Sequence, residues 1–181
     1  MRAAAHMSFM TTTVTVHDSV AFLLGRARGH LSVAAIHRMT YYAQGWHLAW
    51  AGTALFHEEI RIRNSGPVAH ALFPFQKDGA TETEWPAGNA AAITGHSAEV
   101  LKYVFNSYGH MTGISMGELA RKEAPCILAL ARKTSEDTEP VIDLAEMKSF
   151  FKALDDAPED QTAYANRFMA QYTDETLRVW P

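Results

Sequence analysis

The feature that most constrains this fold is a segment, residues 31–51, that has helical periodicity and is apolar on two sides. Steps of four and three place one apolar row along it, formed by Ala35, Met39, Tyr42, Trp46 and Ala49. Tyr41 and Leu48 form a second row on nearly the opposite side. Because both apolar sides need other elements to cover them, we expect a central, mostly buried helix that ends at Gly52.

A third row of this helix is polar and consists of Thr40, Gln44 and His47. Two interpretations of this polar seam stay open. Gln44 and His47 can be satisfied inside the core by backbone groups near the Gly66 turn, or they can open on a groove that binds a partner. Gly45 fits both interpretations, because a residue without a side chain lets another backbone approach closely.

The remaining pattern predicts a mainly α-helical, compact domain with a small strand pair or hairpin. A first helix is expected over residues 18–28, with Asp18 as its N-cap. Residues 58–63 alternate so that Ile60 and Ile62 share one face of a short strand. Further helices are expected at 68–73, from Thr94 or Ser97 to about Tyr108, from a capping box at Ser115, from Asp143 and from Pro158, with loops at 77–89 and 134–140.

The sequence Asn64-Ser65-Gly66-Pro67 is typical of a turn. Gly66 can take a backbone conformation that is closed to other residues, and Pro67 presets φ for the start of the short helix at 68–73. We therefore expect Tyr42, Gly45, Trp46, Gly66 and Pro67 to be structural residues, with Tyr42 and Trp46 buried in the core.

Three segments resemble the Panacea-type (SocA-like) domain of toxin–antitoxin pairs and phage-associated proteins. They are Tyr41-Tyr42-Ala43-Gln44-Gly45-Trp46-His47-Leu48-Ala49, Leu55-Phe56-His57-Glu58-Glu59 and Gly66-Pro67-Val68, within a likeness that covers roughly residues 16–151. The resemblance implies an antitoxin that neutralises a co-encoded toxin by direct protein–protein binding, and not an enzyme. It also allows an adaptor that delivers the toxin to an ATP-dependent protease. A small hydrolase or transferase that uses the His47 seam is the alternative from another class.

Charge and composition exclude several other classes. The 181 residues carry a net charge of −4 at pH 7, so nucleic acid is not expected as the main partner, because binding phosphates needs clustered Lys and Arg. Cys126 is the single cysteine, which excludes an internal disulfide and a Cys-based zinc site, and we expect it to be a small buried hydrophobe. No apolar run approaches the roughly 20 residues that span a bilayer. Without a signal peptide, a cytoplasmic location is expected.

The sequence offers no constellation for catalysis or metal binding. His37, His47 and His57 lie ten residues apart, so they cannot share one face of a helix. Neither a Gly-x-Ser-x-Gly elbow nor a glycine-rich phosphate loop is present. No catalytic residue, cofactor or metal is therefore expected, and the oligomeric state stays open.

Candidate partner-binding residues follow from the polar seam and from aromatic and arginine side chains, which dominate interface energetics. A C-terminal aromatic stripe with steps of four either docks on the protein's own core or anchors a partner. The candidates are Gln44, His47, Arg63, Tyr164, Phe168, Tyr172 and Trp180. The expected organisation is a disordered or tag-derived terminus at 1–15, a helical domain at 16–153 and a C-terminal helical extension at 154–181.

Overall fold

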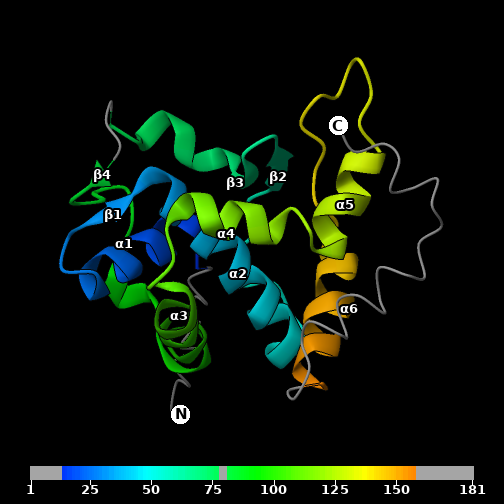
Figure 1. Ribbon diagram of the computed structural model, residues 1–181. Coiled ribbons are helices and arrows are strands. Elements are labelled where there is room, and N and C mark those ends of the chain that lie inside the picture. The colour runs from blue at the N-terminus through cyan, green and yellow to red at the C-terminus, as the bar shows by residue number, and fades with distance from the viewer. Residues whose placement is uncertain (1–13, 78–80, 158–181) are drawn as a thin grey trace, which may run out of the picture.

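The computed structural model describes residues 14–77 and 81–157, and it shows a mainly helical domain with two small antiparallel sheets (Figure 1). In chain order the elements are α1 (Val16–Arg26), β1 (Leu31–Ser32), α2 (Val33–Ala51), β2 (Ile60–Arg63), β3 (Gly66–Ala69), η1 (His70–Phe75), β4 (Thr81–Glu82), η2 (Ala90–Ala92), α3 (Gly95–Tyr108), α4 (Gly113–Ala120), α5 (Ala124–Ala131) and α6 (Leu144–Asp155). The predicted fold class is confirmed. Within the described residues, no helix combines the length and the apolar character that crossing a membrane requires.

Helix α2 is the centre of the domain, as its two apolar rows predicted. Every residue from Ala35 to Leu48 is buried. Ser32 caps its start by accepting a hydrogen bond from the amide of Ala35, and Gly52 ends it in the left-handed conformation, with φ 76°. Helices α1, α3, α4 and α6 and strand β3 pack around α2, which crosses the middle of the view in Figure 1.

The aromatic residues of α2 form the core between this helix and α6. Tyr42 and Trp46 are buried, as predicted, and both rings meet the ring of Phe151 edge to face, with centroids 6.1 and 5.3 Å apart. Gly45 allows a close approach, as predicted, but the group that approaches it is a side chain and not a backbone segment. A Cβ at Gly45 would overlap the Phe151 ring.

The turn at Gly66 connects two strands, and not a strand to a helix as predicted. β2 and β3 pair antiparallel, with Ile62 opposite Pro67 and Arg63 opposite Gly66. The short 3₁₀ helix η1 begins only at His70. Pro67 is tolerated in β3 because its partner Ile62 directs its own amide away from β3, to the carbonyl of Pro140 at 3.0 Å. A proline at this outward position of β3 removes no hydrogen bond from the β2–β3 ladder.

Two helices begin earlier than predicted because a threonine caps each of them. Thr15 is the N-cap of α1, and it forms a capping box with Asp18, which lies inside the helix. Thr112 is the N-cap of α4, and Ser115 is the third residue of that helix. The helix predicted from Pro158 lies outside the described residues.

Candidate functional site

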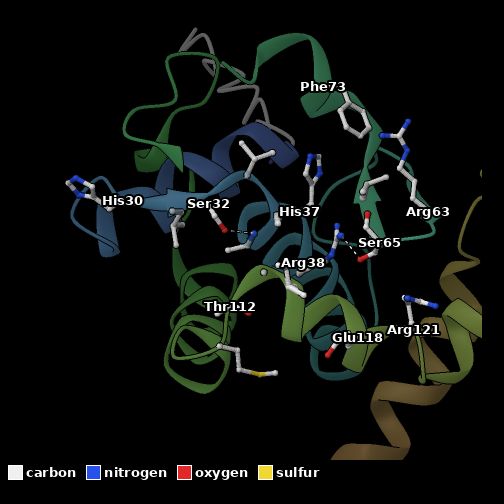
Figure 2. Close-up of a pocket in the computed structure, with 18 residues that line it drawn as sticks. His30, Ser32, His37, Arg38, Arg63, Ser65, Phe73, Thr112, Glu118 and Arg121 are labelled. Atoms are coloured by element: carbon white, nitrogen blue, oxygen red, sulfur yellow. Dashed lines mark hydrogen bonds between the residues drawn. The ribbon is translucent and has the colours of Figure 1, made fainter. Parts of the chain in front are cut away.

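An open groove of about 870 Å³ lies between three parts of the domain: the first turns of α2, the β2–β3 hairpin with η1, and α4 with the loop before it. In Figure 2, Phe73 and Arg63 lie on one side of the groove, and Glu118 of α4 lies on the other with the two residues that cap this helix, Thr112 and Arg121. No single stretch of sequence forms this groove, because its walls come from segments far apart in the chain.

Two glycines set the position of α4, which is one wall of the groove. A Cβ on Gly113 would overlap the backbone of Ala34 and Ala35, and a Cβ on Gly117 would overlap the carbonyl oxygen of Ser65. Helix α4 therefore lies directly against both α2 and the turn of the hairpin. Ile114, between the two glycines, and Glu118, after the second, line the groove.

The groove exposes a large aliphatic side chain. Ile114 of α4 lines it and is 72% exposed. Glu118 and Arg121 follow at steps of four and three, so the three residues share one face of α4. Burial of an isoleucine against a partner is worth roughly 1.5–3 kcal/mol. This face of α4 is thus suited to a contact that excludes water.

Arg38 of α2 holds the β2–β3 hairpin in place. Its side chain is 3% exposed, and it donates from Nη1 to the carbonyl of Pro67 and from Nη2 to that of Ser65, both at 2.6 Å. Burial lowers the pKa of Arg38 to about 10, so the guanidinium still carries its charge at neutral pH. Among the described residues it forms no ion pair with a carboxylate. A positive charge therefore lies under the groove without a negative partner there.

His37 holds the end of strand β3 through Ala69 and carries no charge. Its Nδ1 accepts a hydrogen bond from the amide of Ala69, and its Nε2 lies 3.2 Å from Oε1 of Gln76, which assigns the ring hydrogen to Nε2. Burial lowers the pKa of His37 to about 4, with smaller contributions from the charges of Arg38 and Arg63. The imidazole is therefore neutral at physiological pH and acts as a structural group.

Arg63 is the one predicted partner-binding residue within the described chain that lines the groove. Its guanidinium lies over the ring of Phe73, 4.6 Å from the centroid, and its Nε donates to Oε1 of Glu139 at 2.6 Å. The side chain is 41% exposed. Figure 2 shows Arg63 with its terminal nitrogens pointing away from the strand.

The polar seam of α2 is part of the core and does not reach the groove. Gln44 is buried; it donates to the carbonyl of Phe56 at 2.9 Å and accepts from the amide of Leu55 at 2.8 Å. His47 is also buried, and its Nδ1 lies 2.7 Å from the carbonyl oxygen of Thr53. The interpretation as a satisfied core network is therefore correct for Gln44. Its expected location near the Gly66 turn is wrong, because that turn is held by residues two helical turns earlier in α2.

His47 has one further neighbour that bears on chemistry. Its Nε2 lies 3.5 Å from Oγ of Ser97 on α3, which is the outer limit for a hydrogen bond. Burial lowers the pKa of His47, and the charge of His96 acts in the same direction, while the hydrogen bond to Thr53 opposes them. Neither His47 nor Ser97 lines the groove.

A buried carboxyl group joins the tyrosine pair of α2 to the start of α5. Tyr41 and Tyr42 donate their hydroxyl groups to Oε2 and Oε1 of Glu123, at 2.7 and 3.1 Å. Burial raises the pKa of Glu123 to about 7, although the two hydroxyl groups act in the opposite direction. Burial also raises the pKa of the Cys126 thiol, so this cysteine is a buried core residue, as predicted, and a poor nucleophile.

Replacement of Glu123 by glutamine should change how stability depends on pH. The native pKa, about 7, exceeds the value of 4.5 for an unperturbed glutamate, so the native state binds more protons between these values. The stability that Glu123 contributes is complete below pH 4.5 and is lost as the pH rises through 7, a change of roughly 3 kcal/mol.

Urea unfolding of both proteins from about pH 4.5 to about pH 8 measures this effect. The stability of the wild type relative to Glu123→Gln should fall across that range. His37, whose pKa is shifted the other way, is present in both proteins, so its contribution cancels in the difference. A difference that is the same at every pH would contradict the assignment.

Sequence reasoning missed the groove residues other than Arg63. Arg38 offered one signal, since it is a charged residue within a segment predicted to be buried. Ile114 and Phe73 offered none, because isolated apolar residues are common on surfaces. The other predicted contacts, Tyr164, Phe168, Tyr172 and Trp180, lie outside the described residues. In the described part of the chain, no group of three or more His, Cys, Asp and Glu is placed to hold a metal ion.

No family model matches the sequence, no curated protein matches it, and no solved structure matches the fold.

Proposed function

We propose that this protein is a cytoplasmic antitoxin of the Panacea type, which neutralises a co-encoded toxin by direct protein–protein binding. We further propose that the groove between α2, the β2–β3 hairpin and α4 binds the toxin. The resemblance of residues 41–49, 55–59 and 66–68 to that family supports the first part.

The observation that carries the second part is the 72% exposure of Ile114 in a groove of about 870 Å³. Recognition grooves for protein segments combine exposed aliphatic side chains with a few charged groups at their ends. The motif residues have a supporting role in this proposal. Tyr42 and Trp46 hold α2 in the core, and the turn at Gly66 places the hairpin wall.

Ile114→Glu should abolish neutralisation without loss of stability. The side chain is already exposed, so a carboxylate there costs little in the free protein, but it would be desolvated in the complex. The measurement is growth rescue when the protein is co-expressed with the product of the adjacent reading frame, together with recovery of an equimolar complex. We expect the affinity for the toxin to fall at least tenfold, about 1.4 kcal/mol or more.

Leu144→Glu is the matched control, because Leu144 is 43% exposed on α6 and does not line the groove. This control should neutralise like the wild type. If Ile114→Glu also neutralises like the wild type, the groove is not the binding surface. Rescue that disappears in a host without the ATP-dependent protease would identify the adaptor form of the function. Failure of the wild type to rescue growth would refute the antitoxin proposal.

A further inference from the structure

We propose that the groove recognises an apolar protein segment that carries an aspartate or glutamate, and that Arg63 binds this carboxylate. The inference rests on the proposed function only in that the groove binds protein; it adds the chemistry of the bound segment.

The groove is electropositive although the protein as a whole is acidic. Three arginines line it, Arg38, Arg63 and Arg121. They outnumber the two nearby carboxylates, which are Glu118 in the lining and Glu139, the ion-pair partner of Arg63. The whole chain has a net charge of −4. A cationic groove on an acidic protein favours an acidic partner and disfavours a basic one.

The positive charge is concentrated at one end. Figure 2 shows Arg38, Arg63 and Arg121 toward the same end of the groove, with the single lining carboxylate, Glu118, near them, while His30 and Ser32 lie toward the other end. A smaller hollow of about 400 Å³ continues from this end; it shares Arg63 and Ser65 with the groove and adds one cation, Lys133, and one carboxylate, Glu139. A bound segment would thus place its apolar residues over Ile114 and its carboxylate near the arginines.

Arg63 has the geometry for this carboxylate. Its only hydrogen bond to the described residues comes from Nε, so the two Nη groups at the end of the fork have no hydrogen-bond partner there. The contact with Phe73 holds the plane of the guanidinium in place. A fixed guanidinium with two parallel N–H donors binds a carboxylate in a bidentate manner. Arg38, buried below, adds its charge without moving.

The apolar lining argues against a nucleic acid as the occupant. The lining of the groove includes five aliphatic or methionine side chains, Val33, Ala34, Val68, Met111 and Ile114. Binding of phosphates requires a dense array of Lys and Arg, and aromatic platforms when bases are read. Arg63, with the buried charge of Arg38 near it, fits one carboxylate next to apolar side chains.

Selection from a phage-displayed library of random peptides of about 12 residues tests the inference on the full chain. Enriched peptides should combine an aliphatic or aromatic residue with Asp or Glu, and Ile114→Glu should abolish their binding. For a selected peptide, Asp→Asn or Glu→Gln should weaken binding roughly tenfold. Arg63→Gln should have the same effect, and the two changes together should cost little more than either alone.

Arg63→Lys and Lys102→Gln complete the design. Lysine keeps the charge but loses the fork, so Arg63→Lys should recover only part of the affinity. Lys102 is an exposed cation on α3 that pairs with Glu99 and does not line the groove, so Lys102→Gln should leave the affinity unchanged. Circular dichroism of each variant shows that it is folded. A selection without acidic residues, one without groove-dependent peptides, or additive effects of the two changes would overturn the inference.

This experiment does not require the toxin. Acidic, groove-dependent peptides together with a failure to rescue growth would remove the antitoxin function and keep the groove chemistry. Growth rescue that depends on Ile114, together with selected peptides that lack an acidic residue, would keep the antitoxin function and remove the proposed groove chemistry.

Discussion

Trp46→Ala should lower the free energy of unfolding by about 3–5 kcal/mol, the cost typical of truncating a large buried aromatic. Its ring is 2% exposed and lies between Tyr103 and Phe151, with centroids 5.2 and 5.3 Å away. Its Nε1 also donates to the hydroxyl of Tyr108 at 3.1 Å, which would lose that partner. The substitution thus removes packing and a hydrogen bond together.

Equilibrium unfolding in urea measures this loss, and Trp50→Ala is the control one turn later in the same helix. Trp50 is only half-buried, and it donates to Asp155 at the surface. We expect Trp50→Ala to cost roughly half as much. If Trp46→Ala keeps its urea midpoint but no longer neutralises a toxin, Trp46 is a contact residue and its assignment to the core scaffold is wrong.

Gly66→Val should also destabilise the domain, by more than 2 kcal/mol. Gly66 has φ 116°, a conformation that a β-branched residue strongly resists. An added Cβ would lie 3.0 Å from Nε of Arg38 and 3.0 Å from Cα of Gly117. The substitution would therefore add backbone strain at residue 66 and a steric clash with the Arg38 guanidinium that holds the hairpin.

Gly25→Ala is the matched glycine substitution. Gly25 is exposed in α1, its backbone is helical, and an added Cβ would meet nothing within 4 Å. Alanine there should stabilise the protein by about 0.5–1 kcal/mol. Thermal unfolding should show a lower melting temperature for Gly66→Val and a higher one for Gly25→Ala than for the wild type. A Gly66→Val protein with wild-type stability would show that the turn can adopt another conformation at low cost.

The central helix could be predicted because its signal is long and redundant. Two apolar rows over about twenty residues, with a stop at Gly52, leave no competing structure of that length. The starts of α1 and α4 were missed by three residues each. Thr15 and Asp18, or Thr112 and Ser115, can both cap a helix, and only the geometry of the chain decides between them.

Pro67 shows why a correct local inference can still place the wrong element. A fixed φ and a missing amide hydrogen suit the first turn of a helix, and they suit an outward position in a strand equally well. The choice depends on whether Ile62 pairs across the turn, which is a contact between residues and not a property of Pro67. The groove was missed for the same reason, since Ile114, Phe73 and Arg63 meet only after the chain has folded.

The outer edge of β3 has a consequence for how this domain behaves at high concentration. Strand edges normally offer free amide and carbonyl groups that a second chain can extend, which leads to aggregation. Here Pro67 offers no amide, its carbonyl is taken by Arg38, and the amide of Ala69 is taken by His37. This edge therefore offers no free amide to a further strand, which disfavours extension of the hairpin by a second chain. Pro67, Arg38 and His37 thus disfavour self-association through the strand edge beside the groove.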